Sequence, residues 1–251
     1  MAVTRLEAGR EARYSLRMIQ PDLSLNPAAR IDFRRMGRDN QPLLIIDDVL
    51  LKPEEMIEFA AGSEFSPPPH TKYPGVNALM PEGYGQAILG ALRPLLQRGF
   101  GVPTDIPLHY FGFLALATRA PDQLEPVQKV PHIDAADPFR IAMVHFLCRG
   151  KHGGTGFFRH LSTGLEMVGP RQIADFEATL RQELDDNSLP RHTGGHTPGF
   201  EMIDFADAVF NRLIVYRSNS LHAGLLEDSA LTDDPRTGRL TANSFVYPTK
   251  S

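Results

Sequence analysis

Apolar residues fall in short runs along most of the chain, and the spacing inside each run predicts an element. Residues 42–51 form a compact apolar run that predicts a strand. The next segment, residues 52–62, has a proline and two glutamates ahead of helically spaced apolar residues and ends in Gly62. Proline and acidic residues favour the first turn of a helix and glycine favours its end, so this strand leads directly into a helix.

Two further segments, residues 84–98 and 170–184, carry apolar residues three or four positions apart, which predicts amphipathic helices. Residues 27–36 predict another helix, whose several arginines indicate a solvated face. Residues 65–75 contain four prolines and a glycine and predict a loop. Residues 14–19 predict a short strand near the N-terminus.

From about residue 107 onward the pattern changes to short segments rich in β-branched, aliphatic and aromatic residues, with turn residues between them. Such a series after N-terminal helices indicates a curled antiparallel sheet or barrel that helices brace. The predicted strands are residues 109–118, 139–148, 155–158, 164–168, 200–205, 212–217, 221–226 and 239–247.

The composition limits the classes of protein and partner. A chain of 251 residues with 42% hydrophobic content can bury one large core, so we expect a single domain over residues 1–251. Within it we expect an N-terminal extension (1–41), supporting elements (42–106) and a β core (107–248). The formal charge of −4 gives no attraction to phosphate backbones or anionic lipid, so neither nucleic acid nor a membrane is an expected partner.

A single cysteine, Cys148, excludes an internal disulfide and favours a reducing compartment. It lies in an apolar strand and is expected to be a small core residue. The sequence has no apolar run long enough for a membrane helix and no apolar segment typical of a signal peptide. We therefore expect a cytoplasmic protein, and the sequence leaves open whether it forms a homodimer.

Three residues form a candidate metal site. His132 and Asp134 lie two positions apart, and residues i and i+2 of a strand share one face. His222 follows a second apolar strand and could meet them from a neighbouring strand. Two imidazoles and one carboxylate are the donor set of mononuclear Fe(II) oxygenases and leave positions open on the ion. The alternative is that both histidines are ordinary half-buried residues.

Arg239 and Thr241 add a possible anion site to this arrangement. They share one face of the predicted final strand, with Asn243 after them. An arginine that points into a barrel is costly unless an anion meets it, so a carboxylate ligand would explain its position. The alternative is a surface ion pair with Asp233 or Asp234. Gln128 would share the face of His132 if the strand ran straight through Val130, which makes it a candidate contact to a co-substrate or an ordinary sheet residue.

Several of these segments together resemble the Fe(II)- and 2-oxoglutarate-dependent dioxygenases, nearest the prolyl-hydroxylase-like and phytanoyl-hydroxylase-like branches. They are Pro131-His-Ile-Asp134, the Gly153–Phe158 strand, the strand that leads to His222-Ala-Gly224, Arg239-Leu-Thr241, and the strand and helix from residue 43 to residue 55. The resemblance covers about residues 42–248. It implies a double-stranded β-helix, or jelly roll, as the core of a mainly β protein with supporting helices.

The resemblance also implies roles for individual residues. His132, Asp134 and His222 would be the catalytic iron ligands, and Arg239, helped by Thr241, would hold the distal carboxylate of 2-oxoglutarate. Arg239 follows His222 by 17 residues, a longer gap than in many relatives, so Arg236 is the alternative anchor. We prefer Arg239 because it lies in the strand, whereas Arg236 lies in a turn.

The activity implied by the resemblance is the hydroxylation, or another oxidation, of an unactivated C–H bond with molecular oxygen. The substrate would be a small molecule, an amino acid or a peptidyl side chain. Retention of Asp134 favours hydroxylation over halogenation, because related halogenases have a small residue there. Two alternatives stay open: a cupin-type metalloenzyme that does not use 2-oxoglutarate, and a non-catalytic jelly-roll protein that binds a ligand. The loops at residues 65–75, 120–126, 187–199 and 227–238 are candidates for lids that set specificity.

Overall fold

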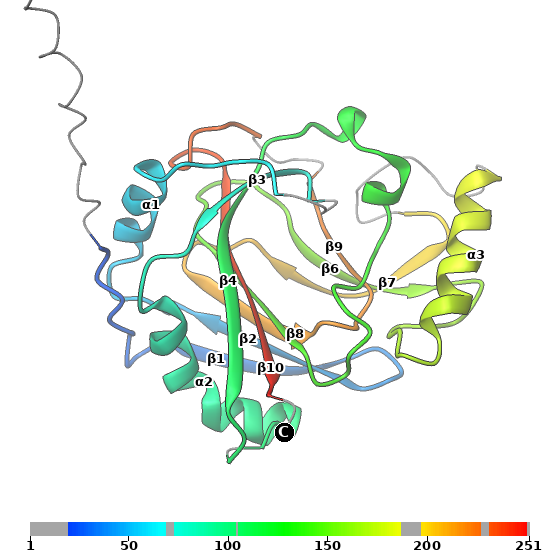
Figure 1. Ribbon diagram of the computed structural model, residues 1–251, viewed down its shortest axis with the longest axis horizontal. Coiled ribbons are helices and arrows are strands. Elements are labelled where there is room, and N and C mark those ends of the chain that lie inside the picture. Colours follow the sequence, from blue (N-terminus) through cyan, green and yellow to red (C-terminus); the bar gives the residue numbers. More distant parts are fainter. Residues whose placement is uncertain (1–19, 69–72, 104, 187–196, 227–230, 250–251) are drawn as a thin grey trace, which may run out of the picture.

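The computed structural model describes residues 20–68, 73–103, 105–186, 197–226 and 231–249. Its main feature is a pair of antiparallel β-sheets, one of seven strands and one of three, that face each other (Figure 1). The large sheet contains, in spatial order, β1 (Arg30–Met36), β2 (Gln41–Asp47), β8 (Arg212–Arg217), β5 (Ile141–Phe146), β10 (Arg239–Pro248), β4 (Leu108–Ala117) and β3 (Gly75–Leu79). The small sheet contains β7 (Phe200–Asp207), β6 (Gly154–His160) and β9 (His222–Gly224).

The path of the chain from β4 onward is that of a jelly roll. β4 belongs to the large sheet, and the segment after it joins the edge of the small sheet through a bridge between His132 and His222. The chain then returns to the large sheet as β5, forms β6 and β7 in the small sheet, and alternates again through β8, β9 and β10. This alternation between two antiparallel sheets defines a double-stranded β-helix, so the predicted fold class is confirmed.

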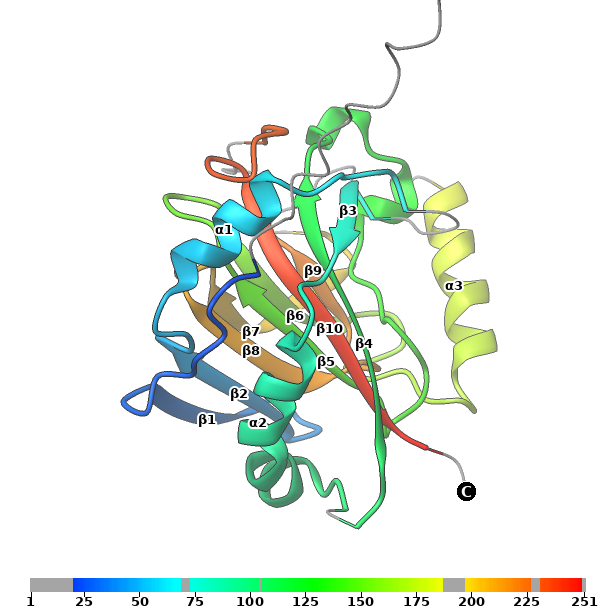
Figure 2. The same cartoon turned by 60° about the vertical axis from the view of Figure 1, so that its left-hand side comes forward.

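Helices cover the outer sides of the two sheets. α1 (Pro53–Ala61) and α2 (Tyr84–Phe100) lie on the outer face of the large sheet (Figures 1 and 2). Their buried residues, among them Met56 and Leu92, pack with outward residues of the large sheet in one apolar cluster. α3 (Ile173–Asp185) lies beside the small sheet, where Phe176 and Phe200 share another cluster. Two short 3-10 helices, η1 (Pro121–Gln123) and η2 (Pro126–Lys129), follow β4.

The space between the sheets is filled mainly by apolar side chains. Phe146 and Ile214 of the large sheet meet Phe157 and Ala206 of the small sheet in one buried cluster. Burying a large apolar side chain contributes roughly 1.5–3 kcal/mol, so this layer stabilises the pairing of the two sheets. Polar residues interrupt it at the inward positions of β10, which begin with Arg239, and this is where the candidate site lies.

Some predicted elements differ from the observed ones. The helix predicted at residues 27–36 is wrong, because β1 occupies Arg30–Met36 and pairs with β2 along its whole length. β3 was not predicted, and the strand expected at residues 164–168 is reduced to an isolated bridge between Met167 and Ser220. The strand predicted at residues 14–19 lies outside the described residues. The other predicted helices and strands are present, with bounds that shift by a few residues.

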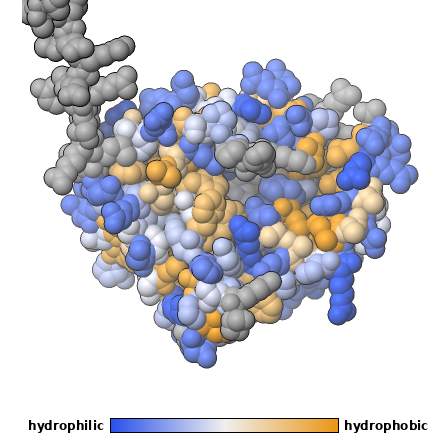
Figure 3. Space-filling model, in the orientation of Figure 1, coloured by the Kyte–Doolittle hydropathy of each residue, from blue (hydrophilic) through white to orange (hydrophobic). Residues whose placement is uncertain are grey.

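Two observations concern the expected partners: the character of the surface and the length of the helices. Hydrophilic and hydrophobic residues are interspersed over the face of the molecule shown in Figure 3. Among the described helices, none has the length and apolar content that crossing a membrane requires.

Candidate metal centre

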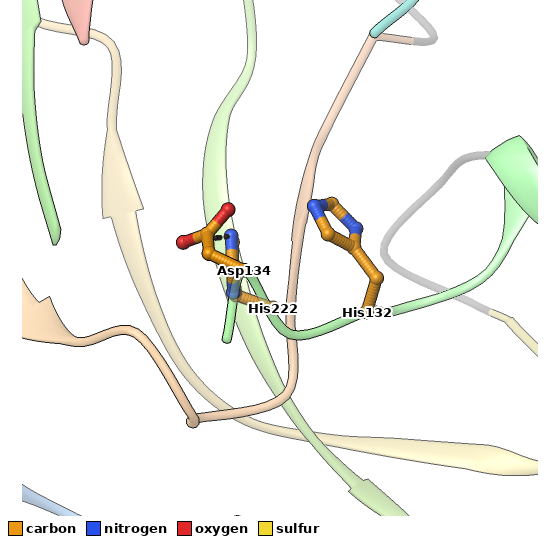
Figure 4. Close-up of side chains that lie close together, drawn as sticks. All are labelled: His132, Asp134 and His222. Atoms are coloured by element: carbon orange, nitrogen blue, oxygen red, sulfur yellow. Dashed lines mark ion pairs between the residues drawn. The ribbon is translucent and has the colours of Figure 1, made fainter. Parts of the chain in front are cut away.

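His132, Asp134 and His222 converge at one end of the barrel (Figure 4). One ligand atom from each residue can be chosen so that all of them lie within 4.8 Å of one another. The Asp134 carboxylate lies 3.6 Å from Nε2 of His222. The structure therefore brings together three side chains that the sequence placed in separate segments.

The backbone fixes the two histidines opposite each other. The His132 N–H donates to the His222 carbonyl oxygen and the His222 N–H donates to the His132 carbonyl oxygen, each at 2.9 Å. This exchange is the hydrogen-bonded pair of an antiparallel ladder, whose side chains project on the same side. The His132 and His222 ring centroids lie 4.6 Å apart. Asp134 is tied separately, because its N–H donates to the Ser218 carbonyl oxygen at 2.9 Å.

A hydrogen bond selects the tautomer of His222. Its Nδ1 lies 3.0 Å from the Ser220 carbonyl oxygen. A carbonyl oxygen can only accept, so Nδ1 carries the proton and the lone pair is on Nε2, the atom nearest to Asp134. Metal-bound histidines commonly have such a partner for the second ring nitrogen, which fixes the orientation of the ring.

Burial shifts the pKa values of this group in opposite directions. Burial raises the pKa of Asp134 to about 6, while the nearby His132 and Arg140 act to lower it. Burial lowers the pKa of His222 to about 4. At neutral pH the carboxylate is therefore ionised and His222 is neutral, which are the protonation states in which both groups can bind a cation.

The donor set fits a divalent transition metal ion. Ligand atoms at ~2.1 Å from one ion lie about 3–4 Å apart, so small side-chain rotations bring this group to coordinating distance. Two imidazole nitrogens and one carboxylate oxygen occupy only part of an octahedral shell. The Asp134 side chain is 19% exposed, so the group can be reached from outside. A closed structural zinc site would need a fourth protein ligand, and the described residues contribute three to this cluster.

Arg239 points inward from the start of β10. It is 6% exposed, and its Nε and one Nη donate to the carbonyl oxygens of His152 and Gly154 at 3.0 and 3.1 Å. The turn between these two acceptors requires a glycine, because Gly153 has a φ of +62° and a Cβ there would lie 1.8 Å from the Leu225 carbonyl oxygen. Among the described residues no ion pair includes Arg239, so neither Asp233 nor Asp234 neutralises it.

Other polar groups lie near Arg239 or further along β10 and β3. Burial raises the pKa of Tyr73 to about 12, while the charge of Arg239 and a hydrogen bond with Thr241 act to lower it. Two buried amide oxygens, Oδ1 of Asn77 and Oδ1 of Asn243, have no hydrogen-bond partner among the described residues. Buried polar atoms without partners are uncommon, so this arrangement can accept a polar ligand.

Gln128 and Arg236, which the sequence also suggested as contacts to a co-substrate, form hydrogen bonds with other residues of the protein. Gln128 lies in η2, where its side-chain oxygen accepts a hydrogen bond from the Glu125 N–H at 2.8 Å. The straight strand on which its prediction depended is therefore wrong, because a capped 3-10 turn occupies that segment. Arg236 lies at the surface and pairs with Glu58 of α1 through Nε at 3.0 Å and an Nη at 2.6 Å.

Sequence reasoning did not identify Tyr73, Asn77 or Tyr216 as part of this region. In the sequence Tyr216 was identified only as a residue of a predicted strand, but its ring centroid lies 4.9 Å from that of His222. Burial, and then the charge of Asp134, raise its pKa well above the usual value. Tyr73 lies in a proline-rich segment that was predicted as a loop. The sequence signal for its role was an aromatic residue just before a short alternating run.

Comparisons with known proteins give one family match and several distant structural similarities. The model of a family described as "Family of unknown function (DUF6445)" matches residues 27–246. No curated protein matches the sequence. Similar solved structures include HygX from Streptomyces hygroscopicus with nickel and 2-oxoglutarate bound, which is 13% identical, with 84% of each chain covered and a TM-score of 0.46.

A second structure of HygX, with hygromycin B bound as well, gives 12% identity, the same coverage and the same TM-score. A prolyl-4-hydroxylase from Pseudomonas putida is 14% identical, with 74% of this chain and 79% of that chain covered and a TM-score of 0.36. The fold itself is established by the strand order of this chain.

Proposed function

The chain belongs to the DUF6445 family. From the geometry of its candidate metal centre we propose that it is an Fe(II)- and 2-oxoglutarate-dependent oxygenase. The observation that carries the proposal is the grouping of His132, Asp134 and His222 within 4.8 Å in a jelly-roll barrel that also contains a buried arginine. The arginine matters because a buried guanidinium that has no carboxylate partner among the described residues is suited to an anionic ligand.

Each residue has a defined role in this proposal. His132, Asp134 and His222 hold the iron, and the Ser220 carbonyl oxygen keeps Nε2 of His222 available to it. Arg239 binds the distal carboxylate of 2-oxoglutarate, and the Thr241 hydroxyl lies two positions along the same face to add a hydrogen bond. The bound iron and co-substrate, with molecular oxygen, would supply the oxidising power to attack an unactivated C–H bond. Asp134 occupies the position that related halogenases leave open, which favours hydroxylation.

The test is an anaerobic titration of the protein with Fe(II) and 2-oxoglutarate, followed by the visible charge-transfer band of the chelated metal. The wild type should give the band. His132→Ala and Asp134→Ala should lose it, because each removes an iron ligand. Arg239→Ala should keep its iron but need at least roughly tenfold more 2-oxoglutarate, since a charge-assisted pair contributes about 1.5–3 kcal/mol.

Arg236→Ala is the matched control, because Arg236 lies three residues earlier and pairs with Glu58 at the surface. Its titration should equal that of the wild type. If Arg236→Ala were impaired and Arg239→Ala were normal, the assigned anchor would be wrong. Iron binding by the wild type without the band would favour the cupin-type alternative, and absence of iron binding would favour a non-catalytic binding protein.

A further inference from the structure

The inner face of the large sheet continues past the metal centre as a row of aromatic side chains. Beyond Asn243 the inward positions of β10 are Phe245 and Tyr247, which lie opposite Phe111 and His109 of β4. The ring centroids of Phe111 and Phe245 are 6.5 Å apart, and those of His109 and Tyr247 are 5.3 Å apart. Phe111 is 55% exposed. This part of the face is therefore aromatic and accessible.

Arg140 connects the aromatic row to the metal centre. Its Cζ atom lies 4.6 Å from the ring centroid of Phe245 and 5.6 Å from that of Tyr247. Ser218 joins Arg140 to Asp134 through the backbone, because the Ser218 N–H donates to the Arg140 carbonyl oxygen and the Ser218 carbonyl oxygen accepts from the Asp134 N–H. Both hydrogen bonds measure 2.9 Å. The backbone of Arg140 is thus held close to that of Asp134, and its guanidinium lies over the aromatic row.

A cavity of about 450 Å³ opens next to Arg140. Its lining includes Ala135, the residue directly after Asp134 in the sequence, so one part of its wall is bonded to a candidate metal ligand. A cavity of roughly 300–1,000 Å³ is the size that holds a small molecule. The lining residues are His109, Ala135, Asp137, Arg140, Tyr247 and Pro248.

The charges in this cavity favour an anion with a single charge. The Arg140 Nε is buried and has no hydrogen-bond partner among the described residues, and none of their ion pairs includes Arg140. Asp137 lines the same cavity, but its Oδ1 accepts a hydrogen bond from the Phe139 N–H at 2.9 Å. A guanidinium stacked on aromatic rings keeps its planar set of donors for a carboxylate. Asp137 would repel a doubly charged phosphate more strongly than a carboxylate.

We propose that this cavity binds the substrate that the metal centre oxidises, and that this substrate is a small carboxylic acid with an aromatic or aliphatic body. The inference rests on the proposed function and names its substrate class. The carboxylate pairs with Arg140, while the body packs against Tyr247 and His109, which line the cavity. The anchoring of Arg140 to Ser218 then holds the bound molecule beside Asp134.

The experiment measures the binding of three probes by calorimetry to the protein loaded anaerobically with Fe(II) and 2-oxoglutarate. The probes are 3-phenylpropionate, hexanoate and 3-phenylpropanamide, the uncharged amide of the first acid. Both acids should bind, and the amide should bind at least roughly tenfold more weakly, because one charged hydrogen-bonded pair contributes about 1.5–3 kcal/mol. Arg140→Gln should weaken the acids by the same factor and leave the amide unchanged.

Arg149→Gln is the matched control, since Arg149 also stacks on a ring, with its Cζ 3.7 Å from the Phe210 centroid, and pairs with Glu54 far from this cavity. It should bind the acids like the wild type. Tyr247→Ala is a second test, because it removes part of the aromatic row and should weaken 3-phenylpropionate. The visible band of the iron and 2-oxoglutarate should persist in every variant, which also shows that each one is folded.

Three results would overturn the inference. They are equal affinity for the acid and its amide, equal affinity of the wild type and Arg140→Gln, and no binding of either acid at millimolar concentration. Loss of the visible band when an acid is added would also count against it, since the acid would then occupy the 2-oxoglutarate site. If the wild type gives no band but still binds acids through Arg140, the result supports the carboxylate site and rejects only the oxygenase assignment.

Discussion

His145 of β5 has its protonation state fixed by burial against α2. Its Nδ1 lies 2.9 Å from the Tyr84 hydroxyl and its Nε2 lies 3.1 Å from Oδ1 of Asn211. Burial lowers the pKa of His145 to about 4, although the hydrogen bond to Asn211 acts to raise it. Tyr84 offers no countercharge, because burial and then Tyr110 raise its own pKa well above the usual value.

The buried His145 should make the stability depend on pH. Its folded pKa is below the unfolded value of about 6.5, so the unfolded chain binds more protons between these values. The stability contribution is therefore complete above pH 6.5 and is lost as the pH falls toward 4. Between pH 7.5 and pH 4.5 the loss from this one group is about 2–3 kcal/mol.

Urea unfolding of the wild type and His145→Gln at both pH values measures this contribution of His145 to the free energy of unfolding. Glutamine can still meet both neighbours but does not titrate, so the loss of unfolding free energy in His145→Gln should be smaller by about 2–3 kcal/mol. The other titrating groups are common to both proteins and cancel in the difference. An equal loss in the two proteins would refute the assignment to His145.

At the scale of residues, the sequence was enough to name the candidate site residues that lie in short motifs. His132 and Asp134 lie two positions apart in a motif, and Arg239 and Thr241 likewise share an alternating strand. Arg140 could not be predicted in this way. Its position over Phe245 depends on the pairing of β5 with β10, which joins segments about 100 residues apart and leaves no local pattern.

At the scale of elements, β1 shows how tertiary pairing overrides a local pattern. Its arginines favour a solvated helix, and its residues are mostly exposed. The alternative signal was the alternation of Ile31 and Phe33, followed by a turn in which Gly37 and Asn40 have positive φ angles of 60° and 52°. The backbone hydrogen bonds to β2 decide between these signals, because propensity is a weak prior when a neighbouring strand offers a complete ladder.

The turn between β1 and β2 is held by the buried carboxylate of Glu166. Its oxygens accept hydrogen bonds from the backbone N–H groups of Arg38 and Asp39 at 3.1 and 3.0 Å, and from Nε of Arg159 at 2.8 Å. Burial acts to raise the pKa of Glu166, but these hydrogen bonds and the charge of Arg159 together lower it. One carboxylate thus joins the β1–β2 hairpin to β6.

Glu166→Gln should destabilise the protein by about 3 kcal/mol, because it leaves the Arg159 charge short of its buried partner. The Glu166 side chain is 3% exposed, whereas that of Glu201, which pairs with the same arginine, is 54% exposed. Glu201→Gln is therefore the control and should cost no more than about 1 kcal/mol. Chemical denaturation measures both values, and equal losses would show that Glu166 is not the main support of this hairpin.

At the scale of the whole molecule, the barrel brings together groups from distant parts of the chain. The order of strands could be expected once the family resemblance was stated, but the sequence alone supports only a series of short strands. The arrangement of side chains around Arg239 could not be deduced, since Tyr73 and Asn77 come from the segment before and within the unpredicted β3. Such contacts depend on which strands become neighbours.

The proposed cofactors should stabilise the entire barrel. A ligand that binds only the folded state at a hundred times its dissociation constant adds about 2.7 kcal/mol. For a chain of this size we expect the melting temperature to rise by roughly 5–10 °C in the presence of Fe(II) and 2-oxoglutarate. Anaerobic thermal denaturation measures this shift. Asp134→Ala should show almost none of it, and a full shift in that variant would place the bound cofactors elsewhere.

The mutual backbone pairing of His132 and His222 has a consequence for biosynthesis. The two residues are 90 positions apart, so a ribosome must release most of the chain before they can meet. Capture of the proposed iron by all three ligands therefore has to wait until the C-terminal part has emerged, and loading would follow the closure of the barrel. Since the protein alone holds these residues in place, a chelator should be able to strip the metal and fresh ferrous salt restore it without a cycle of denaturation.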